Sequence, residues 1–140
     1  MNLIELEKSI RQWGVDRNIT AEGGATVQMQ ISKCLEEVAE AVSTLGKMHQ
    51  IEDRSQDLLF EIEFGSDDYK SSYNEYEQIN EVNYPKLTSQ LKDDLGDIVV
   101  CIIQAARLAD TDLTECLQQS YDEIKDRKGT MQGGKFIKET

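Results

Sequence analysis

The chain has 140 residues, which is enough for one domain whose hydrophobic core needs no disulfide or structural metal. A formal charge of −12 argues against a nucleic-acid backbone or an anionic membrane as the partner, because like charges repel each other. We therefore predict a single globular domain spanning residues 1–140 that binds neither nucleic acid nor membrane.

The first half of the chain predicts two amphipathic helices, over about residues 2–14 and about residues 25–48. The second has the clearer apolar stripe, with residues spaced three and four apart. Its members are Ile31, Leu35, Val38, Val42 and Leu45. We expect this stripe to face the core.

The periodicity is lost between residues 49 and 85, which are acidic and rich in tyrosine. We predict an irregular, partly helical and mobile insertion there. A third helix follows Pro85 and runs to about residue 109, with a stripe formed by Leu91, Leu95, Ile98, Ile102 and Ala105.

A fourth helix is predicted to start at an Asp or Thr cap near residue 112 and to stop before Gly129. The tail after it reads as a loop or a short extended segment. The fold class is therefore all-α, similar to a four-helix bundle, with an irregular insertion at 49–85.

The expected location is the cytoplasm. Cys34, Cys101 and Cys116 lack the paired spacing of a zinc site or the even count of a disulfide framework, which suits a reducing compartment. The first residues include Glu5 and Glu7 where a signal peptide is basic, and no apolar run reaches the ~18 residues of a spanning helix.

Two helices each carry an acid-x-x-acid pair: Glu37 and Glu40 on the second, Asp94 and Asp97 on the third. On a helical wheel Asp94 lies inside the apolar arc of its own helix, so it should have a hydrogen-bonding or cationic partner. Four convergent carboxylates would suit a hard cation such as Mg²⁺. A solvated acidic face is the commoner explanation of the glutamates alone, and with the aspartate pair added the spacing leaves both interpretations open.

The segments "EEVAE" (Glu36, Glu37, Glu40) and "DLGDIVV" (Asp94, Asp97), in this order, resemble the MazG-like, all-α nucleoside triphosphate pyrophosphohydrolases. The resemblance extends to the C-terminal "LTECLQQSYDEIKDRKGTMQGGKFIKE". It covers roughly residues 25–48 and 86–138. Two features depart from the family: Asp94 stands where Glu is usual, and the segment between the motifs is longer.

The resemblance implies that the chain hydrolyses a nucleoside or deoxynucleoside triphosphate to the monophosphate and pyrophosphate. Mg²⁺, or Mn²⁺ as a substitute, would be held by Glu37, Glu40, Asp94 and Asp97. Glu36 or Glu37 would act as the base toward the attacking water. It also implies a homo-oligomer, either a dimer or a tetramer, which a second copy covering apolar flanks would explain.

A triphosphate clamp needs cations, and five residues are candidates for substrate binding. Lys33 lies on the same flank of its helix as Glu36 and Glu37, whereas Lys125, Arg127 and Lys128 cluster at the end of the fourth helix. Trp13 could stack on a base. Each has an ordinary structural alternative, since cations favour a helix C-terminus and a lone tryptophan on an apolar face is usually core.

Two other functions compete with the enzyme. One is a non-catalytic acidic interaction protein that mimics nucleic-acid charge, which would need its carboxylates spread over exposed surface. The other is a degenerate family member that binds nucleotide without turnover. The enzyme instead needs Asp94 and Asp97 at an interior edge facing Glu37 and Glu40.

Overall fold

The computed structural model describes residues 1–65 and 69–140, and the chain divides into two compact units. Unit 1 comprises residues 1–28 and 102–140, and unit 2 comprises residues 29–101. The described residues are mostly helical, with one small two-stranded sheet near the C-terminus. The all-α class is therefore confirmed in broad terms. The four-helix-bundle architecture and the single domain stay predictions.

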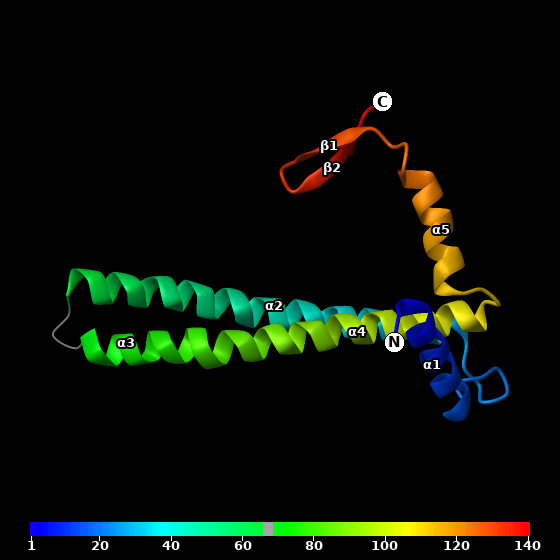
Figure 1. Cartoon of the computed structure of the whole chain (residues 1–140), viewed down its shortest axis with the longest axis horizontal. Helices are drawn as coiled ribbons and strands as arrows, with labels where there is room; N and C mark the ends of the chain where they lie inside the picture. The colour runs from blue at the N-terminus through cyan, green and yellow to red at the C-terminus, as the bar shows by residue number, and fades with distance from the viewer. Residues whose placement is uncertain (66–68) are drawn as a thin grey trace. The chain divides into compact units, whose positions relative to one another are not determined.

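Unit 2 is a long antiparallel helical hairpin (Figure 1). Its first arm is α2 (Val27–Phe64), and its second arm consists of α3 (Tyr69–Gln78), the π-helical turn η1 (Ile79–Asn83) and α4 (Tyr84–Leu108). Side chains join the arms along their length. Serine and tyrosine hydroxyls on the second arm donate to glutamates on α2, at 2.8 Å from Ser72 to Glu61 and 3.0 Å from Tyr84 to Glu52.

Four of the residues that α2 buries, Glu37, Ala41, Thr44 and Met48, recur every three or four positions, as in a coiled coil. Leu58 is buried ten positions further along the helix. On the second arm the corresponding spacing is interrupted, because five positions separate buried Ile79 from half-buried Tyr84. A step of five positions is one residue longer than the longest usual step of four. The π-helical turn η1 accommodates this extra residue, so the inward-facing stripe continues into α4.

The prediction of an irregular segment at 49–85 is wrong for its described residues. Helix α2 continues to Phe64, and the chain is helical again from Tyr69, while residues 66–68 lie outside the described part. The physical reason is that the polar side chains of this region pair across the two arms. Arg54 holds Glu75 through two bonds of 2.9 and 2.8 Å and contacts Glu61 at 3.1 Å. A search for apolar periodicity does not detect such an interface.

The apolar stripe predicted for α2 is present with the predicted spacing, but it does not face the core. Its five members are exposed within one copy of the chain: Ile31, Leu35, Val38, Val42 and Leu45. The buried stripe is the neighbouring one, where small and polar residues such as Ala41 and Thr44 allow the arms to approach. Leu95 on α4 is likewise 51% exposed, against expectation.

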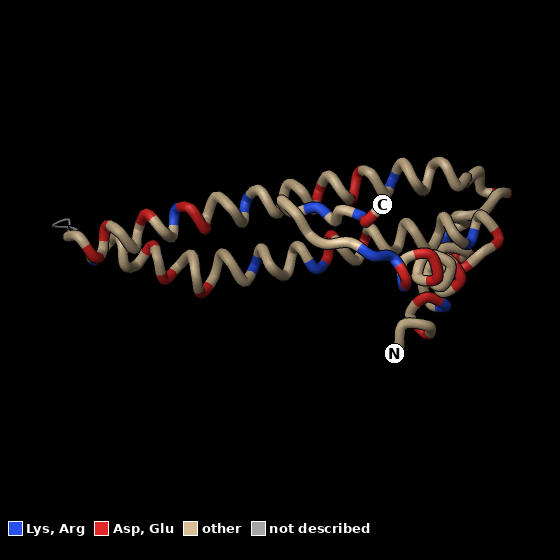
Figure 2. The backbone as a smooth tube through the Cα atoms, turned by 90° about the horizontal axis from the view of Figure 1, so that it is seen from above, with Lys and Arg blue, Asp and Glu red and all other residues tan. Residues whose placement is uncertain are grey.

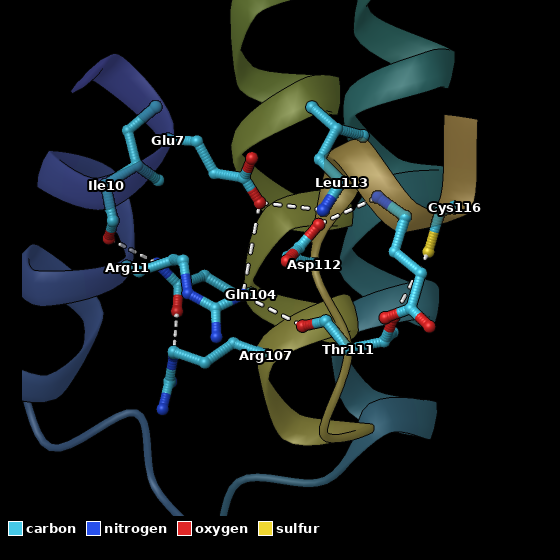
Figure 3. A network of polar contacts seen from close by, with 10 residues as sticks. Glu7, Ile10, Arg11, Gln104, Arg107, Thr111, Asp112, Leu113 and Cys116 are labelled. Atoms are coloured by element: carbon cyan, nitrogen blue, oxygen red, sulfur yellow. Dashed lines mark hydrogen bonds and ion pairs between the residues drawn. The ribbon is translucent and has the colours of Figure 1, made fainter. Parts of the chain in front are cut away.

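Unit 1 contains α1 (Leu3–Asp16), the end of α4, and α5 (Leu113–Ile124), joined by a polar network (Figure 3). Buried Glu7 of α1 accepts a 2.7 Å bond from the backbone N–H of Leu113, and Asp112 caps the same helix. Fully buried Gln104 of α4 donates to the Ile10 carbonyl. The carboxylate of Glu7 thus supports the N-terminus of α5, where the helix dipole favours negative charge.

The predicted extended tail is a β-hairpin. Strand β1 (Gly129–Gln132) pairs antiparallel with β2 (Lys135–Lys138), with Met131 opposite Phe136. The two-residue turn consists of Gly133 and Gly134, whose φ angles of 57° and 77° require the left-handed region that glycine tolerates.

Candidate functional site

One long side of unit 2 carries three of the carboxylates that the sequence singled out, Glu36, Glu40 and Asp97. Because the arms run antiparallel, the positions that immediately precede the inward-facing residues of α2 and of α4 lie on the same side of the hairpin. We call this side the polar face; its members are Glu36, Glu40, Ser43 and Lys47 of α2, and Lys86, Gln90, Asp93 and Asp97 of α4. Figure 2 shows acidic and basic positions following both arms.

The glutamate motif is organised by Lys33, one turn earlier on α2. The Lys33 ammonium lies 2.7 Å from Glu37 Oε1 and 3.0 Å from Glu36 Oε2. Glu37 is 7% exposed, whereas Glu36 faces solvent. The hydrogen bonds to Glu37 and then to Glu36 raise the pKa of Lys33. The predicted position of Lys33 beside both glutamates is confirmed, while its role in substrate binding stays a prediction.

Asp94 is the buried carboxylate of the second motif, at 3% exposure. Its two oxygens accept separate hydrogen bonds, one of 2.6 Å from the Thr44 hydroxyl across the arms and one of 2.8 Å from the Gln90 amide on its own helix. These two bonds, with a smaller contribution from nearby Lys47, hold the pKa of Asp94 below its usual value. The expectation that Asp94 needs a partner is confirmed, and the structure identifies the partners.

Asp97 lies one turn further along α4 and is exposed. Partial loss of solvation, followed by the charges of Asp93, Glu37 and Asp94, raises the pKa of its carboxyl group. Negative charges from both acid motifs therefore act on Asp97. Glu40, the remaining member of the predicted four, is exposed and lines a pocket on the polar face.

The four predicted ligands thus belong to two neighbouring helices, but their side chains do not form a closed set. Within residues 1–65 and 69–140, no group of three or more His, Cys, Asp or Glu side chains lies in a position to hold a metal ion. The donor chemistry still fits Mg²⁺, since all four side chains offer carboxylate oxygens and the charges of Glu37 and Asp94 act on Asp97.

A pocket of about 500 Å³ opens on the polar face between α2 and the second arm. It is formed partly by residues that the sequence analysis had not selected. The residues that matter for its chemistry are Glu40, Ser43, Lys47, Asn83, Lys86 and Asp94. In the sequence, these pocket residues are marked only by the helical spacing of Lys47 from Glu40 and Ser43. This spacing indicates a pocket only when the position of the second arm is known.

The remaining predicted substrate-binding residues belong to unit 1. Lys125 lies 2.9 Å from Asp122 at the end of α5, where Arg127 and Lys128 follow, and all three are exposed. Trp13 on α1 is 46% exposed, so it is not a core residue within one copy of the chain. The role of these four residues in substrate binding stays a prediction.

The chain was compared with known proteins in three ways. A scan against protein-family models, a search of curated proteins and a search of solved structures each gave no match to the chain. Among the described helices, none is both long enough and apolar enough to cross a membrane.

Proposed function

We propose that this protein is a cytoplasmic, Mg²⁺-dependent hydrolase of the MazG-like type, which converts a nucleoside or deoxynucleoside triphosphate to the monophosphate and pyrophosphate. One observation carries the proposal. Each acid-x-x-acid pair places its first carboxylate, Glu37 or Asp94, in the interface between the arms, and its second, Glu40 or Asp97, at the polar face. Solvation alone gives no reason for carboxylates to be buried at both motifs.

In this proposal Glu37, Glu40, Asp94 and Asp97 hold Mg²⁺, and Mn²⁺ would bind the same oxygen donors. The bound ion would neutralise the triphosphate and the departing pyrophosphate. Glu36 and Glu37 are the proposed bases: one of them takes a proton from the water whose oxygen bonds to phosphorus as the bond to pyrophosphate breaks. Lys33 bonds to both glutamates and so positions their carboxylates.

The proposal includes a homo-oligomer, a dimer or a tetramer. The side of the hairpin opposite the polar face is apolar, and its residues are exposed in one copy: Ile31, Leu35, Val38, Val42 and Leu45 on α2, with Leu95 and Val99 on α4. We call this the apolar face. A row of large aliphatic side chains along two adjacent helices favours association with an equivalent surface.

A degenerate member that binds nucleotide without turnover is the second candidate. It is favoured by the hydrogen bonds that already occupy one position on each oxygen of Asp94. The acidic charge mimic is less well supported, because Glu37 and Asp94 are buried and cannot contribute to an exposed charged surface.

The test is a screen of the common NTPs and dNTPs with Mg²⁺, in which pyrophosphate and orthophosphate are both measured. We expect release of pyrophosphate from at least one nucleotide and loss of this activity in EDTA. Nucleotide binding without release of either product would support the degenerate member instead. Absence of both binding and turnover across the panel would refute the proposal.

A further inference from the structure

The pocket on the polar face contains two lysines, one from each arm. Lys47 comes from α2, and Lys86 comes from the first turns of α4. Within the described residues neither ammonium group forms an ion pair, whereas Lys33 and Arg54 on α2 each bind two glutamates. Among the described residues, two lysines without an ion pair therefore share this pocket with the carboxylates of Glu40 and Asp94.

Two neutral side chains of the pocket suit an anion with several oxygens. Ser43 contributes a hydroxyl and Asn83 an amide, both capable of donating to phosphate oxygens. A volume of about 500 Å³ is in the range of small-molecule sites, large enough for an extended polyphosphate and water. Glu40 and Asp94 line the same pocket, so the two lysines adjoin two of the proposed Mg²⁺ ligands.

We propose that Lys47 and Lys86 bind the phosphate tail of the substrate, with Ser43 and Asn83 as neutral donors. This inference rests on the proposed function and deepens it, because it places the polyphosphate on the polar face of unit 2 with cations other than those expected from the sequence. Two ammonium groups on opposite walls can contact two phosphates of one chain, so a triphosphate binds more tightly than a monophosphate.

The test uses inorganic tripolyphosphate as the probe, measured by calorimetry with Mg²⁺ in excess. The variant is the full chain carrying Lys47→Gln and Lys86→Gln, and the matched control is Lys70→Gln, an exposed lysine on α3 outside the pocket. A charge-assisted hydrogen bond contributes about tenfold in affinity or more. We expect the double variant to bind tripolyphosphate at least ~30-fold more weakly and the control to bind it like the wild type.

The outcome separates this inference from the proposed function. If the screen finds a hydrolysed nucleotide but the double variant keeps its KM and its tripolyphosphate affinity, the lysine site is wrong and the hydrolase stands. If no nucleotide is hydrolysed while tripolyphosphate binding still depends on both lysines, the hydrolase is wrong and the anion site stands. Equal weakening in Lys70→Gln would attribute the effect to overall charge and would overturn the site. Circular dichroism confirms that each variant is folded.

Discussion

The Thr44 hydroxyl donates a 2.6 Å hydrogen bond to the buried carboxylate of Asp94, joining residues that are 50 positions apart in the chain. This bond and the one from Gln90 allow an ionised carboxylate to lie in the interface between the arms. Asp94 is therefore both a structural residue of the hairpin and a proposed metal ligand.

Thr44→Val should lower the melting temperature, because it keeps the shape of the side chain but leaves an oxygen of buried Asp94 without its donor. We expect a fall of roughly 5 °C or more in differential scanning calorimetry. Thr44→Ser is the matched control and should stay close to the wild type, since it retains the hydroxyl. Equal melting temperatures for the valine variant and the wild type would show that the bond does not stabilise Asp94.

Asp97→Asn should lower Mg²⁺-dependent turnover by orders of magnitude while leaving the fold intact. Partial loss of solvation and the neighbouring charges raise the pKa of Asp97 and disfavour its charged form, so removing the charge should leave the apo melting temperature equal or higher. The rise in melting temperature on adding Mg²⁺ should disappear.

The matched control for Asp97 is Asp93→Asn, which removes a neighbouring charge on the polar face without touching the four proposed ligands. It should keep most of the activity and the response to Mg²⁺. An Asp97→Asn protein that is fully active on its best nucleotide, or that unfolds, would contradict the four-carboxylate site.

Val42→Asp tests the apolar face. Val42 is 61% exposed in one copy, so the substitution should not disturb the hairpin itself, but it would place a charge inside an interface between copies. Light scattering at micromolar concentration should give the mass of a dimer or tetramer for the wild type and a lower mass for the variant. Gln50→Asp, at an exposed position on the same helix, should keep the wild-type mass. A monomeric wild type would refute the proposed assembly.

Arg54→Gln tests the polar pairing in the distal part of the hairpin. Ser72 and Arg54 hold the pKa of Glu61 below its ordinary value of 4.5, and Arg54 does the same for Glu75. A lowered folded-state pKa gives stability that is present above the unfolded value and lost as pH falls through the folded one. The wild type should therefore melt above the variant at pH 7, and this difference should shrink as pH falls below about 4.5.

A melting-temperature difference between the wild type and Arg54→Gln that stays constant from pH 7 to pH 3 would show that the arginine acts by packing alone. Arg17→Gln, at an exposed position in unit 1, is the charge-matched control and should show no comparable pH-dependent loss.

Local sequence was sufficient to predict the helices on either side of the middle segment and the helical positions of both acid pairs. It also predicted that Asp94, a carboxylate on an apolar face, needs a partner. A helical period of 3.6 residues determines which side chains share a face, and an acid on an apolar face signals a missing partner. The contact between Lys33 and the two glutamates follows in the same way, because residues three and four apart on a helix are neighbours.

Only the tertiary structure decided which face of α2 is buried. Two adjacent stripes run along this helix, and the more hydrophobic one, through Val38 and Val42, is exposed while the one through Ala41 and Thr44 meets the second arm. The choice depends on the pairing of distant segments and on the extra residue that η1 accommodates, neither of which appears in local periodicity. The same pairing places Lys47 and Lys86 on one pocket, because the sequence specifies each helix whereas packing between helices specifies the site.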